Sequence, residues 1–400
     1  MGRIVHFGLG NFARAHLLDY TADAGGWDVV GVSLRSPKVR DGLVVQGFAY
    51  DLCVQGQGVK RIDVIHDVLV ASEDPKVVLN AMAKAEIISV TVTEKGYHLD
   101  ASGLLDLEDP DIGADLVGQG PSTLIGFLAH GLVGRQMPVT VLSCDNRVEN
   151  GTALARAVKR FAQAAGLVID WGIVRFPNAM VDRITPATTA NVRAISGDPM
   201  AVPTEAFREW VIEDDFAGPR PDWPDVQFVS DVAPHELRKL RMLNGAHSLI
   251  AYAGLACGHV FVNQAIADVE LRAWVVSLMQ EAATTLPTEV RGEALAYAKA
   301  LVGRFENPEL MHRLDQIAMD GSQKVPYRFI ATLRDADGNA PAVIKGIQAW
   351  VDFCISETAM GKVLNDPKAK ALMDAARGKD PLMKILSLVN AADLAPLIRV

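Results

Sequence analysis

Four polar side chains interrupt a predicted apolar helix in the stretch PHELRKLRMLNGAHSLIAY, residues 234–252. They are Glu236, Lys239, Asn244 and His247. At about 100° per residue all four project from one side of a helix, and leucines occupy part of that side. A polar group among apolar neighbours needs a partner or a chemical task, because burial without either costs free energy.

These groups suit the oxidation of a secondary alcohol, in which the hydroxyl proton must leave as hydride leaves carbon. Desolvation lowers the pKa of a lysine, so Lys239 is the candidate general base. Asn244 can donate an N–H to the developing alkoxide, and His247 can hold the substrate oxygen or the lysine. Glu236 is placed to relay protons to solvent. The structural alternative is an ordinary Glu236–Lys239 ion pair together with a satisfied interior histidine.

Motifs for several other chemistries are missing from the sequence. No tyrosine begins a Y-x-x-x-K dyad, and no Cys/His spacing supports a zinc alcohol dehydrogenase. Neither G-x-S-x-G nor G-x-x-x-x-G-K-[ST] occurs. The four cysteines are far apart and are expected to be reduced thiols. We therefore expect chemistry without a metal ion.

Short apolar runs alternate with helical patterns through roughly the first 180 residues. The runs are RIVHFGLG, WDVVGVSLR, AEIISVTVT, MPVTVLSC and WGIVRFP. Continuous hydrophobicity is typical of strands covered on both faces in a parallel sheet. We predict an α/β protein with a Rossmann-type, doubly wound, dinucleotide-binding domain in residues 1–228. Helical periodicity dominates beyond the proline-rich AGPRPDWPDV, which predicts a mostly α-helical substrate and catalytic domain in residues 229–400.

The turn after the first strand carries a dinucleotide-binding pattern. IVHFGLGNFARAH places Gly8 and Gly10 between a strand and a helix in the order G-x-G-x-x-A. A side chain at Gly10 would hold the backbone away from a pyrophosphate, and the new helix offers free N–H groups. We expect Gly8, Gly10, Asn11 and Phe12 to bind the cofactor, and a purely structural turn is the alternative.

The second strand ends in GVSLRSP, without the acid that commonly binds the adenine ribose. Arg35 stands there instead, and it could stack on adenine, meet a 2′-phosphate, or be a solvated surface arginine. The expected cofactor is NAD, and the chemistry of this strand end leaves NADP open.

The composition argues against macromolecular partners. The 400 residues contain 48 acidic and 39 basic side chains, a net charge of −9. Such a protein is a poor binder of nucleic acid or of an anionic membrane surface. The N-terminus enters a strand-like run without the plan of a signal peptide, and no apolar stretch is long enough to span a bilayer. We expect a cytoplasmic monomer or small homo-oligomer with a small-molecule substrate.

Seven motifs, in order, resemble the mannitol dehydrogenase family, the polyol-specific long-chain dehydrogenases and reductases. This family also includes fructuronate and tagaturonate reductases. The motifs are HFGLGNFARAH, GVSLRSP, TEKGY (93–97), SCDNRVENG (143–151), NAMVDRITP (178–186), KLRMLNGAHS and MDGSQKVP (319–326). The resemblance runs through most of the chain.

The resemblance implies a lysine general base and an oxyanion pocket of two asparagines and a histidine, with no metal. The K-x-x-x-x-N-x-x-H spacing maps these roles onto Lys239, Asn244 and His247. The second asparagine matches Asn146 in SCDN. Glu94 and Glu236 resemble glutamates that are associated with gating and proton transfer.

Three further positions follow from the same resemblance. Asp182 matches a substrate-contacting aspartate and Lys324 a substrate-contacting lysine, while Lys95 of TEKGY is expected with Glu94 beside the cofactor. Asn146, Asp182 and Lys324 each have an ordinary explanation as well. Asn146 could be a turn residue, Asp182 could form an ion pair with its neighbour, and Lys324 could be a solvated loop lysine. Some polyol members have an arginine eight residues before this lysine, where the present chain has glutamine, so hydroxyl contacts at that end can differ.

The first interpretation is a metal-independent NAD(P)-dependent oxidoreductase that interconverts a mannitol-like polyol and its 2-ketose, with Lys239 as general acid/base. A second is an aldonate or ketouronate oxidoreductase resembling fructuronate or tagaturonate reductase. Its substrate carboxylate requires a cation, for which Lys324, Arg328 and Arg313 are candidates. Two further functions stay open, a phosphopolyol dehydrogenase and a non-catalytic NAD-binding sensor. The intact lysine, asparagine and histidine set argues against the sensor.

Overall fold

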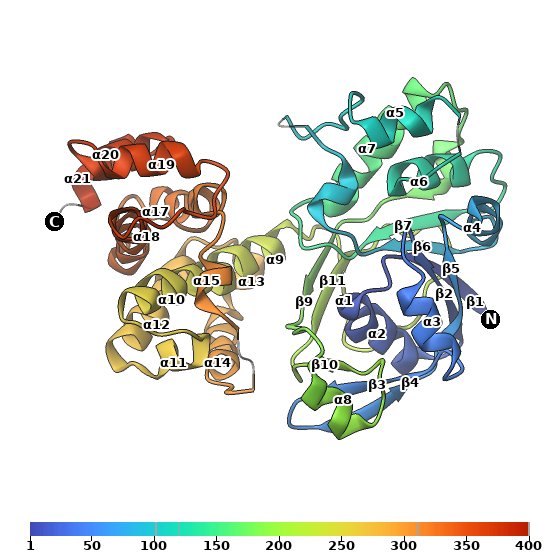
Figure 1. Ribbon diagram of the computed structural model, residues 1–400, viewed down its shortest axis with the longest axis horizontal. Helices are drawn as coiled ribbons and strands as arrows, with labels where there is room; N and C mark the ends of the chain where they lie inside the picture. The colour runs from blue at the N-terminus through green and yellow to red at the C-terminus, as the bar shows by residue number, and fades with distance from the viewer. Residues whose placement is uncertain (101, 119, 310–311, 399–400) are drawn as a thin grey trace. The chain divides into compact units, whose positions relative to one another are not determined.

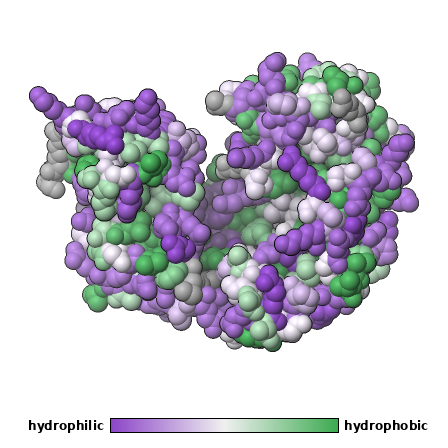
Figure 2. All heavy atoms as spheres, viewed as in Figure 1, coloured by the Kyte–Doolittle hydropathy of each residue, from purple (hydrophilic) through white to green (hydrophobic). Residues whose placement is uncertain are grey.

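The computed structural model describes residues 1–100, 102–118, 120–309 and 312–398. The chain divides into two compact units, Met1–Ala233 and Pro234–Val400 (Figure 1). The first unit is α/β and the second is mostly helical, which confirms the predicted fold class. Hydrophilic side chains cover much of the visible face of each unit (Figure 2). No helix in the described chain has both the length and the apolar character needed to cross a bilayer.

A six-stranded parallel sheet forms the centre of the first unit, in the order β5-β2-β1-β6-β7-β8. Its strands are β1 (Gly2–Phe7), β2 (Trp27–Ser33), β5 (Ile65–Val70), β6 (Ile87–Val90), β7 (Val139–Ser143) and β8 (Val174–Arg175). The chain proceeds outward from β1 through β2 to β5 and then returns to β6 on the other side of β1. Ligands of doubly wound sheets bind at such a reversal, beside the carboxyl ends of the strands.

The five apolar runs of the sequence correspond to β1, β2, β6, β7 and β8. The sequence analysis does not predict β5, since His66 and Asp67 interrupt its apolar pattern. β5 lies at the edge of the sheet, where one side of a strand has no neighbour. A polar interruption is tolerated there better than at the centre.

Helices and small sheets cover the two faces of the parallel sheet (Figure 1). Val5 and Phe7 of β1 belong to one hydrophobic core and Ile4 to the other, as alternation along a strand requires. Helices of the first core are α4 (Pro75–Met82), α5 (Pro110–Leu116), α6 (Leu124–Leu132) and α7 (Asn150–Ala164). Helix α2 (Leu17–Ala24) contributes to the second core.

Two three-stranded sheets, which the sequence analysis does not predict, also contribute to the second core. They contain β3 (Tyr50–Val54), β4 (Gly58–Ile62) and β10 (Val202–Thr204), and β9 (Ala179–Asp182), β11 (Glu209–Glu213) and β12 (Gln227–Val229). The short helices of this unit are α1 (Asn11–Ala15), α3 (Lys38–Val44), α8 (Ala190–Ser196), η1 (Glu94–Tyr97) and η2 (Trp171–Ile173).

Helix α10 is the central element of the second unit. It packs against α11, α12, α15 and α18 and is buried on nearly all sides, as expected for a helix that is apolar around its circumference. The first helices of this unit are α9 (Ala233–Arg238), η3 (Lys239–Asn244), α10 (Gly245–Ala256), α11 (Val262–Ala267), α12 (Val269–Thr284), α13 (Thr288–Arg291) and α14 (Ala294–Phe305). The later helices are α15 (Leu314–Ile317), α16 (Gly321–Val325), η4 (Pro326–Ile330), α17 (Ala331–Asp335), α18 (Pro341–Ala359), α19 (Ala369–Ala376), α20 (Pro381–Ser387), η5 (Ala392–Leu394) and α21 (Ala395–Ile398).

The helix predicted around residues 234–252 is not uniformly α-helical. Between α9 and α10 the chain forms a π-helical segment, η3, that begins at Lys239 and ends at Asn244. A wheel drawn at 100° per residue is therefore wrong across this segment, because a π-turn has wider winding than an α-turn. π-bulges within helices occur frequently at functional sites.

Candidate active site

The turn after β1 contains two glycines, and the structure requires only one of them to be glycine. Gly8 has φ +92°, and a Cβ placed on it would lie 1.9 Å from the carbonyl oxygen of Thr91. Gly10 has φ −80°, and the protein atom nearest to its Cβ position is Gly8 O at 3.9 Å. The fold therefore requires glycine at position 8 but not at position 10. The open space at Gly10 fits the close approach of a dinucleotide phosphate.

His6 supports this turn from inside the sheet, a role that the sequence analysis missed. Its Nδ1 lies 2.9 Å from Ser89 Oγ on β6, and its Nε2 lies 3.3 Å from Gly8 O. Burial lowers the pKa of His6 to about 4, so the ring is neutral at physiological pH. A histidine in an otherwise apolar strand was the available signal.

The side chain of Asn11 binds protein groups. Its Nδ2 donates to Thr188 Oγ1 at 3.1 Å, and its Oδ1 accepts from Arg14 Nη2 at 2.7 Å. The neighbouring Phe12 stacks on His16 with ring centroids 5.1 Å apart. These contacts fix the start of α1, where the first backbone N–H groups of a helix lack intrahelical acceptors and can bind a phosphate.

Arg35 follows the carboxyl end of β2 and has an exposed side chain, with a relative accessibility of 81%. Its Nη2 donates to Asp111 Oδ2 at 3.0 Å. An ion pair between exposed side chains is weak, so this contact does not commit the guanidinium to a structural role. The side chain is accessible to the adenosine end of a nucleotide.

Asp145 joins the ends of β6 and β7 and was missed by the sequence analysis. Its carboxylate is buried and accepts from Val92 N at 2.6 Å and Tyr97 OH at 2.7 Å. Ser143 Oγ lies 3.2 Å from the same carboxylate. Burial raises the pKa of Asp145 to about 6, although these hydrogen bonds oppose the shift.

Three predicted site residues lie on the two loops that Asp145 joins. Asn146 is exposed in the bend after β7, and Lys95 is exposed in η1 after β6. Glu94 begins η1, but its side chain lies outside those that the structure describes. Because β6 and β7 are parallel neighbours, both loops emerge at the carboxyl edge of the sheet.

Asn150, at the start of α7, connects the Asn146 loop to β9. Its buried Nδ2 lies 3.0 Å from Asp145 O and 2.8 Å from Ala179 O, and its Oδ1 accepts from Ala179 N at 2.9 Å. Strand β9 ends at Asp182, whose side chain is buried. The motifs SCDNRVENG and NAMVDRITP are therefore held together by one amide.

The sequence left open an ion pair between Asp182 and Arg183. In the structure Arg183 binds Asp19 and the Glu205 carbonyl. Its Nη1 lies 2.5 Å from Asp19 Oδ2, and its Nε donates to Glu205 O at 3.2 Å. Successive residues of an extended chain point to opposite sides. Arg183 thus anchors the end of β9 to α2.

The four candidate residues Glu236, Lys239, Asn244 and His247 lie on α9, η3 and α10, toward the two ends of the π-helical segment. Glu236 lies in α9 and Lys239 begins η3, and both side chains are buried. Asn244 ends η3 and is half-buried, and His247 lies in the first turn of α10 and is buried. The expected burial of polar groups on this helix is thus observed.

His247 lies among aromatic and basic side chains of the second unit. Its ring centroid is 4.7 Å from that of Phe305 and 5.5 Å from that of His312. Burial, followed by the positive fields of His312, Arg304 and Arg328, holds the pKa of His247 well below its ordinary value. The imidazole is therefore neutral and can act by hydrogen bonding.

His312 is a second imidazole in this region that the sequence analysis missed. Burial lowers its pKa, and the charge of Lys324 lowers it further. No hydrogen-bond partner of its buried Nδ1 occurs within the described ranges of the chain. No local motif marks this residue, because its neighbours in space come from α10 and α16.

Lys324 lies in α16 and is not a solvated loop lysine. Its Nζ donates to Met319 O at 2.6 Å and to Ile317 O at 3.3 Å. Glycine at 321 is required here, because a Cβ would lie 2.3 Å from Trp350 Nε1. The motif MDGSQKVP therefore packs against α18 and places its lysine over the preceding turn.

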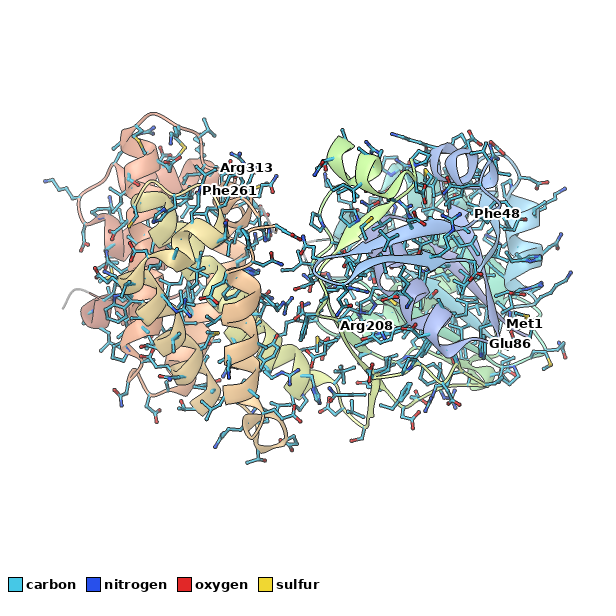
Figure 3. The ribbon with its side chains drawn as sticks, turned by 90° about the horizontal axis from the view of Figure 1, so that it is seen from below. Met1, Phe48, Glu86, Arg208, Phe261 and Arg313 are labelled. Atoms are coloured by element: carbon cyan, nitrogen blue, oxygen red, sulfur yellow. The ribbon has the colours of Figure 1, made fainter. Side chains whose placement is uncertain are left out.

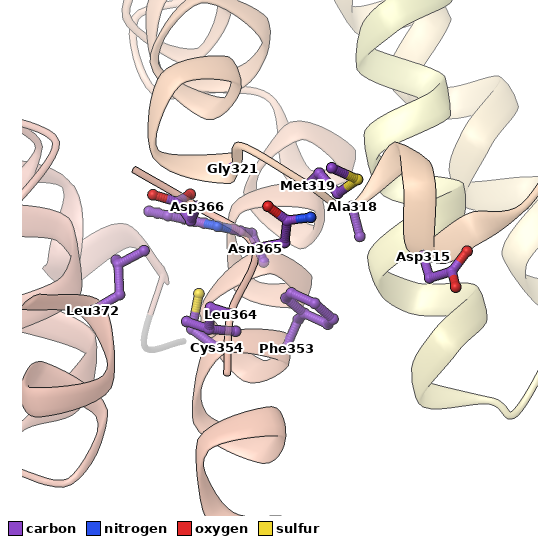
Figure 4. A pocket seen from close by; sticks show the side chains of 11 residues that line it. Asp315, Ala318, Met319, Gly321, Phe353, Cys354, Leu364, Asn365, Asp366 and Leu372 are labelled. Carbon is purple, nitrogen blue, oxygen red and sulfur yellow. The ribbon is translucent and has the colours of Figure 1, made fainter. Parts of the chain in front are cut away.

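A cavity of about 40 Å³ lies beside this motif, in the second unit (Figure 4). Asp366 and Asn365 are among its polar lining residues. Asp366 already accepts from Ser322 N at 2.7 Å and Ser322 Oγ at 2.6 Å. The cavity has room for water, and Asp366 is already engaged by Ser322.

The other two candidate cations for a carboxylate differ from each other. Arg313, which lies beside Phe261 in Figure 3, is exposed and forms a two-pronged ion pair with Asp315 at 2.7 and 3.0 Å. Arg328 donates to Ser248 Oγ at 2.8 Å and to Asn244 O at 3.2 Å, and within the described residues it has no carboxylate partner. Burial lowers the pKa of Arg328 to about 10, where it is still a cation at neutral pH.

Metal-ligating side chains do not gather in the part of the chain that the structure describes. No group of three or more His, Cys, Asp or Glu residues there could hold a metal ion. The four cysteines are free thiols, of which Cys144 and Cys354 are buried.

Two family models match successive parts of the chain. The mannitol dehydrogenase Rossmann domain matches residues 2–225, and the mannitol dehydrogenase C-terminal domain matches residues 231–395. Among curated relatives, D-mannonate oxidoreductase of Escherichia coli (strain K12) is 38% identical over 399 residues, which cover 91% of this chain and 82% of that protein.

Solved structures match over nearly the whole chain. A substrate-free D-sorbitol dehydrogenase aligns with a TM-score of 0.87 and 30% identity, covering 99% of this chain and 91% of that one. The ternary complex of Pseudomonas fluorescens mannitol 2-dehydrogenase with NAD and D-mannitol aligns with a TM-score of 0.82 and 30% identity, covering 99% and 90%.

Proposed function

The chain belongs to the mannitol dehydrogenase family, and from this premise we propose that it is a metal-independent, NAD-dependent oxidoreductase that interconverts an open-chain polyol and its 2-ketose. The first unit is proposed to bind the dinucleotide and to supply Asn146 and Asp182, and the second unit to supply Lys239, Asn244, His247 and Lys324. The observation that carries the proposal is the set of Lys239, Asn244 and His247 around η3, of which the lysine and the histidine are buried. The same chain has a glycine turn whose Gly10 leaves room for a phosphate.

The residues of the glycine turn fit the dinucleotide. Gly10 lets the backbone approach a pyrophosphate. The first N–H groups of α1 are available to the phosphates, and the exposed Arg35 is available to the adenosine end of the dinucleotide. Lys95 and Glu94 are proposed to lie near the cofactor, as in the resemblance. NAD, when bound, would supply the hydride acceptor, and the residues of this chain would manage the proton and the charge on oxygen.

Lys239 is proposed as the general base that removes the hydroxyl proton. The side chain of Lys239 is buried, and removal from water favours the neutral amine that can accept a proton. Asn146 and Asn244 each donate an amide N–H to the oxygen as it gains charge. The neutral imidazole of His247 orients that oxygen, and Glu236 passes the proton toward solvent.

The remaining substrate hydroxyls are proposed to bind Asp182 and Lys324. A carboxylate accepts hydrogen bonds from hydroxyl groups, and an ammonium group donates to them. Neither interaction requires a charged substrate. An acidic protein does not repel a neutral polyol, whereas it repels an anion at long range.

A sugar acid is the second candidate substrate, because one half-buried cation, Arg328, has no carboxylate partner among the described residues. The guanidinium of Arg328 contacts a backbone carbonyl and a hydroxyl beside Asn244. A guanidinium can bind a substrate carboxylate through two parallel hydrogen bonds. The E. coli relative named D-mannonate oxidoreductase also fits an aldonate substrate.

We also propose a cytoplasmic location. The four cysteines are free thiols, which is the usual state of cysteine in reducing compartments.

The experiment is a substrate panel followed by absorbance of reduced nicotinamide at 340 nm. D-mannitol, D-sorbitol and D-mannonate are each tested with NAD and with NADP, and the corresponding ketoses and ketouronate with NADH and with NADPH. The polyol proposal predicts the highest kcat/KM for a polyol with NAD. A sugar acid preferred over every polyol would establish the second candidate instead. NADH binding without turnover of any compound would overturn both and leave a sensor.

A further inference from the structure

We propose that Asp145 is a positioning residue of the active site, whose buried carboxylate fixes the β6 loop to the β7 loop and thereby sets the side chain of Asn146. The inference rests on the proposed role of Asn146 in holding the substrate oxygen. It adds a residue that acts through its neighbour and does not itself touch the substrate.

The carboxylate binds groups from both loops. On the β6 side it accepts from Val92 N at 2.6 Å and from Tyr97 OH at 2.7 Å, so both ends of the TEKGY loop are attached to it. On the β7 side Ser143 Oγ lies 3.2 Å from Oδ2 and 2.8 Å from Tyr97 OH. Val92 is 53 residues from Asp145 in the sequence, so the link joins separate crossovers of the sheet.

The backbone of Asp145 is equally constrained. Its carbonyl oxygen accepts from Arg147 N at 2.8 Å, which closes a tight turn whose central residue is Asn146. The same oxygen accepts from Asn150 Nδ2 at 3.0 Å. Asp145 is thus held through both its side chain and its backbone carbonyl, while the next residue, Asn146, is exposed.

An acid at this position is costly for folding, which points to a function. The neighbouring groups that could affect its charge are Tyr97, Cys144 and Arg147, and the Arg147 guanidinium lies over the Tyr97 ring at 5.8 Å. Burial raises the pKa of Asp145, so its ionised form is disfavoured relative to water. A carboxylate can accept at both oxygens, whereas an asparagine accepts at only one. Acceptance at both oxygens lets this one side chain hold Val92 and Tyr97, at the two ends of the β6 loop.

The test compares Asp145→Asn with a matched variant of a structural acid. Asp115 is also buried, and its carboxylate accepts from the N–H and hydroxyl groups of Ser122 and Thr123 at 2.7–2.9 Å. Asp115→Asn therefore removes a comparable buried carboxylate. That carboxylate joins α5 to the start of α6, and the groups that it binds lie outside the predicted site loops. Tyr97→Phe deletes a single hydroxyl and serves if Asp145→Asn folds poorly.

Kinetics are measured below the unfolding transition of every variant. We expect Asp145→Asn to lower kcat at least ~10-fold and Tyr97→Phe to lower it less, while Asp115→Asn stays within about 2-fold of wild type. The acid limb of the wild-type pH profile should also flatten in Asp145→Asn. Equal losses of kcat in the Asp145 and Asp115 variants would overturn the inference, because they would indicate a general effect of destabilisation.

Hydrogen exchange supplies a readout that does not depend on the substrate. Amides of residues 92–97 and 143–147 should exchange faster in Asp145→Asn than in wild type, and those of the parallel strands should not. Unchanged exchange overturns the inference even if the protein is an active dehydrogenase. If exchange is faster in Asp145→Asn but the wild-type protein turns over no polyol or sugar acid, the proposed function is refuted. The link between the two loops is then still supported.

Discussion

Replacing Gly10 by alanine should remove cofactor affinity without disturbing the fold. The φ of −80° suits any L-residue, and the nearest protein atom to the new Cβ is 3.9 Å away. Because Gly10 is the N-cap of α1, where alanine is less favourable than glycine, we expect the free energy of unfolding to fall by no more than about 1 kcal/mol. The methyl group lies where the backbone would approach a pyrophosphate, so the Kd for NADH should rise at least ~10-fold, equivalent to about 1.4 kcal/mol.

Gly8→Ala is the matched control for this prediction. Its Cβ would lie 1.9 Å from Thr91 O, and its φ of +92° is unfavourable for alanine. Both effects act on the folded state, so we expect a loss of more than about 2 kcal/mol in the free energy of unfolding. The two variants should therefore separate stability from cofactor binding.

Urea unfolding followed by tryptophan fluorescence gives the stability of both variants. Fluorescence titration with NADH gives the affinity of the folded protein. Wild-type affinity in Gly10→Ala would refute the reasoning, since it would mean that the open space at this turn is not where the pyrophosphate binds. A large loss of stability in Gly10→Ala would show that the packing argument is wrong.

Three further predictions concern the proton acceptor, the loop connection and the response to acid. Lys239→Met should lower kcat at least ~100-fold with an unchanged Kd for NADH, and a kcat near wild type in stopped-flow or steady-state assays contradicts its role. Asn150→Ala deletes five hydrogen bonds and leaves Ala179 N–H and C=O without that partner, so urea unfolding should show a loss of about 3 kcal/mol. The folded pKa of His6, about 4, is below the unfolded value of 6.5, so the unfolded chain binds more protons between these values and stability falls as pH falls through this window. This one group accounts for up to about 3 kcal/mol, and unfolding of His6→Gln at pH 7 and pH 4.5 should show a smaller difference than wild type.

The sequence was sufficient to predict the parallel sheet because its strands are apolar on both faces. Val5 and Phe7 serve one core and Ile4 the other, so the run reads as continuously hydrophobic. The six strands of the smaller sheets are only three to five residues long, and their pairing depends on distant partners such as β3 and β10. Local periodicity does not contain that information.

Candidate site residues could be proposed where their spacing along one segment carried the pattern. Lys239, Asn244 and His247 lie within nine residues, and their polarity contrasts with an apolar helix. Asp145 and Asn150 could not be recognised as anchors, because their partners Val92 and Ala179 are 53 and 29 residues away. Which groups meet there depends on the register of parallel strands and on the return of the chain through β9.

The π-helical segment makes chain length, and not only residue type, a determinant of the backbone geometry around Lys239 and Asn244. An i→i+5 turn contains one residue more than an i→i+4 turn, so deleting one residue between Lys239 and Asn244 would allow regular α-winding to continue from α9 into α10. Glu236 and His247 would then keep nearly the same relative rotation, because a π-turn accommodates its extra residue within one turn, and only the wider turn itself would be lost. Loss of turnover in a folded single-residue deletion variant, with turnover kept in conservative apolar variants of Leu240, would therefore show that the wider π-turn itself is required.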